Sequence, residues 1–442
     1  MSPEPEIRRR IAESGPITFA EFMEVALYWP QGGYYAARDP VGGSEDPIGA
    51  EGDYYTSPLV HPAFGALLAV QLFQMWQIMD RPAEFTVVEQ GAGNGLLGRD
   101  IVSFAAGLPA GFPDCFRYVC IDRRLIRGLE TSLSNTHQVA SAGLPVRPIQ
   151  GCVLSNEYLD AIPVHQVTIE PGGLKEVYVT LDIDNGELVT RTGQLSTPAL
   201  AERFESLGLS LREGQTAEVN LGLEGWAEEA AATLERGFVL TVDYGRPDQE
   251  LYSPDDRFNG TLTTFHQHLQ TDAPLKRIGR QDITAQVDFT SAVNAGRRAG
   301  LEPIGYTTQR DFLHHLNLAH FLERVGSQDG GQREIQSGRA GMLELVKPGG
   351  LGDFKVLVQG KNIGQPNLWG FESAQEAQEL VARFPAPKLT RSHLNLAQGR
   401  YPSLEMEFEP FWPTEEQPEA DPSNHSQHQV HRGGGDTNLS GT

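Results

Sequence analysis

The stretch Phe85-Thr86-Val87-Val88-Glu89-Gln90-Gly91-Ala92-Gly93-Asn94-Gly95 decides the fold that this sequence predicts. Its first four residues form a short apolar run that is typical of a buried strand. A glycine-rich turn follows, and we expect a helix from that turn to about Phe104. A strand, a glycine turn and a helix in this order predict the first unit of a parallel, Rossmann-like α/β sheet.

Further segments along the chain also have the pattern of buried strands. We predict strands over residues 116–121, 151–155, 238–242 and 354–358. The first three end in polar residues, namely Asp122, Asn156-Glu157 and Asp243-Tyr244-Gly245. Residues 164–192 have the pattern of short strands separated by turns, with turn signals at Pro171-Gly172-Gly173 and Asp184-Asn185-Gly186. This pattern predicts antiparallel strands. We read residues of about 164–225 as an insertion into the sheet.

The composition excludes several classes of protein. Of the 442 residues, 39% are hydrophobic and 21% are charged, which favours a globular chain. The formal net charge of −23 argues against nucleic acid as a partner, because phosphate binding needs a surplus of lysine and arginine. No run of 18 or more apolar residues is present, so we expect no membrane span. The first ten residues lack a signal pattern, and we therefore expect a cytoplasmic protein.

The three cysteines, Cys115, Cys120 and Cys152, are too irregularly spaced for a zinc site or a disulfide framework. We expect them to be small buried residues and we predict no metal site.

The spacing of the glycines selects between two nucleotide cofactors. A dinucleotide fingerprint, G-x-G-x-x-G, would need glycine at position 96, which is Leu96. The pattern is instead an acid followed by three alternating glycines, which suits S-adenosylmethionine. That cofactor carries an ammonium and a sulfonium cation, which an acid at the strand end would help to hold. The candidate cofactor-binding residues are therefore Glu89, Gly91, Gly93, Asn94 and Gly95.

Asp122 supplies a second half of this cofactor site. It follows the second strand, where an acid in the analogous dinucleotide fold accepts hydrogen bonds from the ribose hydroxyls. The alternative is that the glycine turn only closes a corner between strand and helix. The strand, the two acids and the glycine spacing together favour the cofactor.

A resemblance to a known family extends these inferences. The chain resembles the MidA (DUF185-type) family, which includes a mitochondrial complex I assembly factor that methylates a protein arginine. The similar segments run from about Gly15 to Lys361: Gly15-Pro16-Ile17, Gly33-Tyr34-Tyr35, Gly52-Asp53-Tyr54-Tyr55-Thr56-Ser57-Pro58, Ser155-Asn156-Glu157-Tyr158-Leu159-Asp160-Ala161-Ile162-Pro163-Val164, Asp243-Tyr244-Gly245, Gly260-Thr261-Leu262, His268, residues 282–289, Thr308-Gln309 with Phe312-Leu313, and residues 352–356.

The resemblance implies a class I S-adenosylmethionine-dependent methyltransferase core with an N-terminal helical lid and an antiparallel β insertion. We accordingly expect a helical lid over residues 1–80, a methyltransferase domain over 81–412 and a disordered tail over 413–442. The chain departs from the family at Ala92 and Asn94, where proline and arginine are usual, and at Leu59 and Val60, where glutamate and isoleucine are usual.

The candidate catalytic residues are Glu157, Asp160 and Asn156, which follow a strand at the carboxyl edge of the sheet. If the acceptor is a guanidinium, carboxylates can hold it bidentately and polarise one nitrogen. The i, i+3 spacing would place the two carboxylates on one side of a helical turn, with Glu157 as the main acceptor. The alternative is that Asp160 caps the next helix and Glu157 is solvated.

Other candidates have equally plain structural explanations. Asp53, Tyr55, Thr56 and Ser57 could close over the cofactor, or the segment could simply begin a helix, for which Thr-Ser-Pro is well suited. His268 could orient the substrate, and Asp243 could face the site. Asp282 and Asp288 are better explained as structural.

We therefore predict protein arginine methylation, with a protein partner that by resemblance is a respiratory-complex subunit. A methyltransferase acting on a small molecule or another side chain, and a non-enzymatic assembly factor, are the alternatives.

Overall fold

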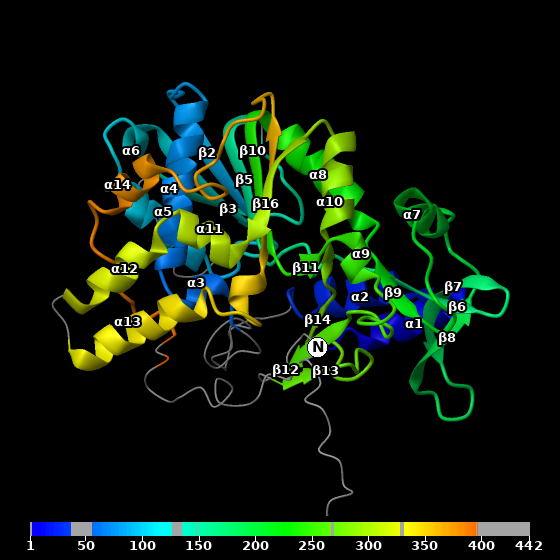
Figure 1. Cartoon of the computed structure of the whole chain (residues 1–442). Helices are drawn as coiled ribbons and strands as arrows, with labels where there is room; N and C mark the ends of the chain where they lie inside the picture. Colours follow the sequence, from blue (N-terminus) through cyan, green and yellow to red (C-terminus); the bar gives the residue numbers. More distant parts are fainter. Residues whose placement is uncertain are drawn as a thin grey trace, which may run out of the picture.

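Figure 1 shows the computed structural model of the chain, which describes residues 2–36, 55–125, 135–146, 148–266, 269–327, 331–394 and 396. Two parts stand side by side, a large α/β core that contains α4 and β2, and a smaller antiparallel sheet around β6, β7 and β8. The predicted tail over 413–442 lies outside the described residues, as do Asp53 and His268.

The core is a seven-stranded sheet in the order β16-β17-β10-β5-β2-β3-β4. The strands β2 (Phe85–Gln90), β3 (Phe116–Asp122), β4 (Thr136–Ala140), β5 (Ile149–Asn156) and β10 (Leu234–Asp243) run parallel. The last strand, β17 (Lys355–Lys361), runs antiparallel between β10 and β16 (Glu302–Thr308). Numbered along the chain, this order is 3-2-1-4-5-7-6, the order of class I methyltransferases, and it confirms the predicted fold class.

The strand β16 was not predicted from the sequence. It carries Pro303 and Gly305, and its pairing with β17 shifts between them. Proline is tolerated only at edge strands or irregular positions, and β16 lies at the edge of the sheet. Proline and glycine argue against a strand in the sequence of this segment. They are tolerated here because the strand lies at the edge of the sheet.

Alternation along the strands fills a core on each face of the sheet. In β5, Leu154 joins one buried cluster and Val153 the other, and in β10 Leu240 and Val239 divide in the same way. The first cluster surrounds α4 (Ala63–Ile78) and α5 (Leu96–Ala105), while the second lies under α8 (Gly222–Thr233) and α10 (Phe289–Arg298). Helices thus cover both faces of the parallel strands, as this fold requires.

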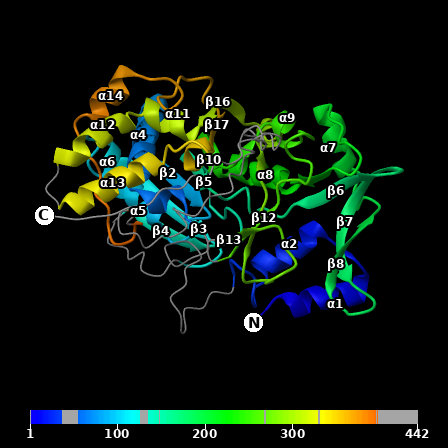
Figure 2. The same ribbon diagram turned by 60° about the horizontal axis from the view of Figure 1, so that its bottom comes forward.

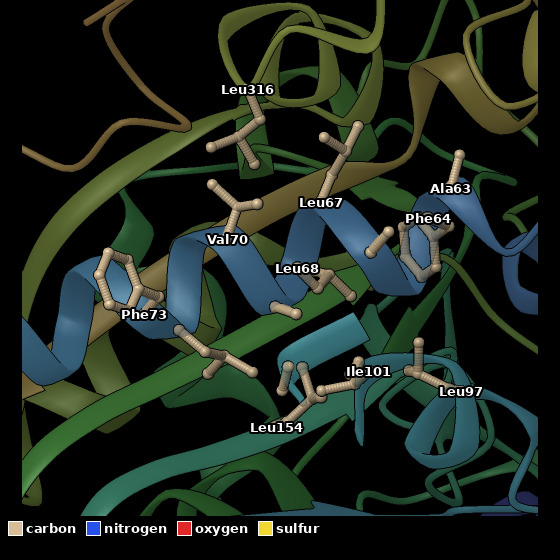
Figure 3. Close-up of a cluster of buried hydrophobic side chains, with 14 of the residues drawn as sticks. Ala63, Phe64, Leu67, Leu68, Val70, Phe73, Leu97, Ile101, Leu154 and Leu316 are labelled. Carbon is tan, nitrogen blue, oxygen red and sulfur yellow. The ribbon is translucent and has the colours of Figure 1, made fainter. Parts of the chain in front are cut away.

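The helix α4 is buried along almost its whole length. Figure 3 shows its apolar side chains meeting those of α5, β5 and Leu316: Ala63, Phe64, Leu67, Leu68, Val70 and Phe73 with Leu97, Ile101 and Leu154. A helix that is apolar on all sides belongs inside a protein. The helix α4 is therefore part of the core.

The insertion is a five-stranded antiparallel sheet in which β1 (Ile17–Thr18), β7 (Gly173–Leu181), β6 (His165–Glu170) and β9 (Thr216–Val219) are successive neighbours. The strand β8 (Leu188–Gly193) pairs with β7, and Gly186 takes a left-handed conformation in the predicted turn between them. The antiparallel strands predicted for this stretch are confirmed.

Residues 1–80, expected to form one helical lid, are divided between the two parts. The helices α1 (Glu4–Ser14) and α2 (Phe19–Tyr28) pack with Val179 of the insertion sheet, whereas α4 belongs to the core. Figure 2 shows this separation, with α1 and α2 beside β7 and β8. A capping box begins α2, because Thr18 accepts a hydrogen bond from the Glu21 N–H and Glu21 accepts one from the Thr18 N–H. The strand β1 separates α1 from α2 and ties them to β7.

Shorter elements complete the chain: α3 (Ser57–Val60), α6 (Phe112–Cys115), α7 (Ala199–Leu207), α9 (Asp248–Leu251), α11 (Gln309–His315), α12 (Leu318–Arg324), α13 (Gln332–Glu344), α14 (Gln375–Val381), β11 (Gly245–Arg246), β12 (Thr263–His266), β13 (Leu269–Thr271), β14 (Asp282–Thr284), β15 (Val287–Asp288), and the 3-10 turns Val325–Ser327 and Leu351–Asp353. No helix among the described residues has the length and apolar character needed to cross a membrane. The three cysteines are buried and free, as expected.

Candidate functional site

The glycine turn lies between β2 and α5, where the strand order of the sheet reverses. Gly91, Gly93 and Gly95 all have left-handed φ angles, of 72°, 55° and 72°. A residue with a Cβ adopts this conformation at a cost of about 1–2 kcal/mol, so the three glycines explain how the turn forms. The N–H groups of Gly91 and Ala92 both donate to the Ile121 carbonyl, at 2.9 and 3.1 Å. The turn is thereby fixed to the end of β3.

Asp122 lies directly beside this turn. Its Oδ2 accepts a hydrogen bond from the Gly93 N–H at 3.0 Å, while its Oδ1 accepts only a long one from the Arg124 N–H, at 3.4 Å. Burial raises the pKa of this carboxyl, and the backbone N–H groups oppose that shift. The structure therefore brings Asp122 and the glycine turn together, and Oδ1 keeps acceptor capacity for hydroxyl groups.

Glu89 is placed in the interior beneath the turn. It is 3% exposed and accepts a hydrogen bond from the Tyr118 hydroxyl at 3.0 Å. Burial raises its pKa to about 8. Asn94 has a local contact too, since its Oδ1 accepts a hydrogen bond from the Leu96 N–H at 3.1 Å at the start of α5. Direct contact of Glu89 or Asn94 with a cofactor stays a prediction.

Gln90 and Tyr158 join the turn to the next strand, and neither was among the predicted site residues. The Gln90 Nε2 donates to the Tyr158 hydroxyl at 3.0 Å, and a Cβ placed on Gly91 would lie 2.6 Å from Tyr158 Cδ2. The Gln90 Oε1 is buried and has no hydrogen-bond partner among the described residues. A buried acceptor without a donor, at a glycine turn beside Asp122, fits a ligand with hydroxyl and ammonium groups.

Glu157 lies at the end of β5, the strand next to β2. Its φ is 51°, in the left-handed region, and its N–H donates to the Val242 carbonyl of β10 at 2.8 Å. The helical turn predicted for residues 157–160 is therefore wrong. The i, i+3 argument requires right-handed backbone angles, and no helix follows, since the next element is the strand β6. Asp160 consequently caps no helix either.

The side chain of Glu157 is half-buried and has polar neighbours. Its Oε1 accepts hydrogen bonds from Asn156 Nδ2 at 3.0 Å and from the Ser57 N–H at 3.4 Å. Burial raises its pKa to about 8, and the nearby Asp160 carboxyl adds to this shift. The structure thus brings the three predicted catalytic residues to one edge of the sheet, although through a different backbone path.

Asp160 and Asp243 are buried beside Glu157. Asp160 is 6% exposed and Asp243 is fully buried. Burial raises the pKa of both carboxyls, while a hydrogen bond with the Tyr244 hydroxyl opposes the shift of Asp160. The arrangement therefore concentrates three carboxyl groups at this edge of the sheet, and burial is the largest cause of each raised pKa.

Thr56 and Ser57 begin α3, as one of the two proposed alternatives predicts, and the Ser57 N–H also donates to Glu157. Both are buried, and the Ser57 Oγ donates to Gln309 Oε1 at 3.0 Å. Tyr55 donates to Glu344 at 3.3 Å, and burial raises its pKa. The Ser57 N–H of this segment donates to Glu157, and closure of the segment over the cofactor stays a prediction.

The helix α2 covers the other side of the Asp160 segment. The Tyr28 hydroxyl donates to the Ala161 carbonyl at 2.8 Å, and the Arg123 guanidinium lies 4.0 Å from the Tyr28 ring centroid. Tyr35, whose ring stacks on that of Tyr28, donates to Asp282 at 2.7 Å. Neither Tyr28 nor Arg123 was predicted as a site residue. Their contact joins α2 to the end of β3, and no local sequence pattern indicates that these segments meet.

Asp282 and Asp288 both accept backbone hydrogen bonds, and the charge of Asp282 also helps to raise the pKa of Glu157. Besides the Tyr35 hydroxyl, Asp282 accepts the Ile283 N–H at 2.9 Å. Asp288 caps α10 by accepting the Ser291 N–H at 2.9 Å.

The sheet order, the glycine turn with Asp122 and the carboxyl edge at Glu157 define a class I S-adenosyl-L-methionine-dependent methyltransferase. Residues 67–307, more than half of the chain, match the model of a family of S-adenosyl-L-methionine-dependent methyltransferases, and the chain belongs to this family. The resemblance recognised in the sequence is thereby confirmed.

Named relatives agree with this assignment. The rat "Protein arginine methyltransferase NDUFAF7, mitochondrial" is 28% identical over 378 residues, which are 78% of this chain and 80% of the relative. The Drosophila melanogaster homologue is 27% identical over 352 residues, 72% and 76% of the two chains. A crystal structure from Burkholderia thailandensis, bound to S-adenosyl-homocysteine, is 27% identical with a TM-score of 0.73 and covers 85% of this chain and 96% of that one. S-adenosylmethionine is accordingly the cofactor of this enzyme.

Proposed function

We propose that this methyltransferase transfers the methyl group to an arginine side chain of a protein partner. The observation that carries the proposal is the carboxyl edge beside the glycine turn, where Glu157, Asp160 and Asp243 lie together. All three have raised pKa values, chiefly because of desolvation, and neighbouring carboxyls add to the shifts of Glu157 and Asp243. The names of the curated relatives support the same substrate class.

A guanidinium is the cation that fits this edge best. It is planar, always protonated and carries five N–H donors, so it can bind a carboxylate through two parallel hydrogen bonds. The Glu157 carboxylate would hold it with one oxygen already fixed by Asn156 and Ser57, leaving Oε2 and part of Oε1 for the ligand. Asp160 Oδ1, buried without a hydrogen-bond partner among the described residues, is a second acceptor.

The bound cofactor supplies an electrophilic methyl group on a sulfonium. The residues of the chain then have to position the acceptor nitrogen and make it more nucleophilic. An ionised Glu157 does both, because hydrogen bonds to a carboxylate orient the guanidinium and pull positive charge away from the reacting nitrogen. The ion pair would lower the pKa of Glu157 and so favour its charged form when the substrate is bound.

The net charge of −23 supports a basic protein segment as the substrate. The resemblance further favours a subunit of a respiratory complex, and we infer a cytoplasmic location from the sequence. These finer assignments rest on the sequence alone.

A labelling experiment tests the proposal. The protein is incubated with methyl-labelled S-adenosylmethionine and a lysate that lacks it, and labelled residues are identified by mass spectrometry. Label on arginine, lost in Glu157→Gln but kept in Glu187→Gln, is the expected result; Glu187 is an exposed glutamate in a distant hairpin turn. Label confined to lysine, or to small molecules, would overturn the arginine assignment.

A further inference from the structure

Asp243 connects the two halves of the site through the backbone. It ends β10, and its Oδ2 accepts the N–H groups of Tyr158 at 3.1 Å and Leu159 at 2.8 Å. Its Oδ1 accepts the N–H of Tyr244 at 2.8 Å. Tyr158 and Leu159 are the two residues that directly follow Glu157. One buried side chain therefore fixes the path of the chain after Glu157.

The conformation of Glu157 makes such support necessary. A left-handed φ is unfavourable for a residue with a Cβ, and it persists only where the surroundings impose it. Here the Val242 carbonyl holds the Glu157 N–H at 2.8 Å, and the carboxyl of the next residue in β10 holds the two following N–H groups. Two adjacent residues of β10 thus clamp the turn on both sides.

The same clamp sets the position of Tyr158 against the cofactor turn. The ring of Tyr158 packs on Gly91, and its hydroxyl accepts a hydrogen bond from Gln90. Since Glu157 and Tyr158 are adjacent, a shift of this backbone would move the acceptor carboxyl and the contact with the glycine turn together. Leu159 anchors the other end of the segment, because it is buried in the cluster with Val153 and Val239.

We propose that Asp243 is a positioning residue for methyl transfer, which holds the Glu157 turn so that the Glu157 carboxyl and the glycine turn keep a fixed separation. The inference rests on the proposed function, because it requires Glu157 to hold the acceptor. Asp243 itself is fully buried and spends both oxygens on backbone N–H groups, so it has no role in direct contact with substrate.

The carboxyl chemistry explains why asparagine cannot take this place. The three backbone donors are shared between two acceptor oxygens. An asparagine of the same size offers one oxygen and one NH₂ group, and the NH₂ group would face an N–H donor in either orientation. The substitution therefore loosens the turn while leaving the volume of the buried side chain unchanged.

A double-mutant cycle separates positioning from general destabilisation. The wild type, Asp243→Asn, Glu157→Gln and the double variant are compared in kcat and KM with the methyl acceptor identified by labelling, and in cofactor affinity by calorimetry. We expect Asp243→Asn to lower kcat about 10- to 100-fold, since small misplacement of a catalytic group costs this much. In the Glu157→Gln background it should lower kcat further by less than about threefold, because the group that it positions is already absent.

Asp288→Asn is the matched control, because Asp288 is also a buried aspartate that accepts a backbone N–H, at the start of α10. It should lower the unfolding temperature without a comparable loss of kcat. If Asp243→Asn does not fold, Asp243→Ser, which keeps one acceptor oxygen, takes its place in the cycle.

The inference is overturned if Asp243→Asn lowers kcat by the same factor in the wild type and in the Glu157→Gln variant. Equal factors would mean that the two residues act independently and that Asp243 has only a structural role. Failure of the proposed function is distinguishable, because the wild type would then transfer no label to arginine, whatever the behaviour of the variants.

Discussion

Two neighbouring strands of the core end in the same backbone conformation but with opposite kinds of residue. The strand β2 leads into Gly91, with φ of 72°, and the adjacent β5 leads into Glu157, with φ of 51°. At the first turn the residue type itself permits the conformation. At the second, bonds from β10 impose it on a glutamate. The cofactor half of the site is thus encoded locally, and the acceptor half by tertiary structure.

The difference has a functional reason. A turn that admits a cofactor must be free of side chains, and glycine provides that. A turn that must present a carboxyl cannot use glycine, and its backbone has to be held from outside. A substitution at Gly91 therefore tests cofactor binding, whereas a substitution at Glu157 tests the acceptor carboxyl and the bonds that hold its backbone.

Glu157→Gln is expected to lower kcat by about 100- to 1000-fold, the loss typical of removing one group that stabilises charge in the transition state. The amide keeps the size of the side chain but cannot pair with a guanidinium. The affinity for S-adenosylmethionine, measured by calorimetry, should change by less than about threefold, because the Glu157 carboxyl accepts its hydrogen bonds from Ser57 and Asn156, which lie outside the glycine turn.

Glu187→Gln serves as the control, since this glutamate is exposed and distant from the site. Unchanged kcat in Glu157→Gln, with normal kcat in the control, would show that the acceptor half does not depend on this carboxyl.

The pH dependence of kcat/KM should report the same carboxyl. Burial and Asp160 raise the pKa of Glu157 to about 8, so in the free enzyme the group is neutral below that pH and charged above it. Because only the charged form binds a cation, kcat/KM should rise about tenfold per pH unit up to about pH 8 and then level off. The guanidinium stays protonated throughout and adds no step.

Glu157→Gln should remove this rising limb. If the rise with pH persists in the variant, the titrating group is not Glu157. Asp160, whose pKa is also raised by burial, would then be the candidate.

This contrast also explains how far the sequence could be read. The glycine spacing and Asp122 predicted the cofactor half, because a left-handed turn and an acid at a strand end leave a local signature. The residues Glu157 and Asp160 were found by the polar ending of a strand and by resemblance. Their backbone was predicted wrongly as a helical turn, since nothing local indicates that Asp243, some 85 positions later, holds Tyr158.

The fold, too, could be predicted only where the sequence pattern is local. Apolar runs located β2, β3, β5 and β10, whereas the edge strand β16 and the pairing of β1 with β7 depend on segments far apart in the chain. The contacts of Tyr28 with Arg123 and Ala161 arise in the same way, where α2 meets the core.

Gly91→Ala should weaken cofactor binding by about tenfold or more, from the cost of a left-handed alanine and a clash in the turn. The added Cβ would lie 2.6 Å from Tyr158 Cδ2, so the ring or the turn must move. Calorimetry with S-adenosylmethionine measures the change. Gly186→Ala is the matched control, because Gly186 has φ of 71° with nothing within 4 Å of the added Cβ. Equal cofactor affinity in both variants would contradict a role for the Gly91 contact.

The smallest expected effect is on stability at position 157. Glu157→Gly and Glu157→Gln both remove the carboxyl, so their difference isolates the backbone. Glycine relieves a left-handed cost of about 1–2 kcal/mol but loses about 0.5–1 kcal/mol of chain entropy on folding, so Glu157→Gly should be the more stable by up to about 1.5 kcal/mol. Denaturant unfolding measures the two free energies. The same pair at Glu187, which does not have a left-handed φ, should show the reverse order. If glycine is the less stable residue at both positions, Glu157 is not strained, and the clamp formed by Val242 and Asp243 does not hold an unfavourable turn.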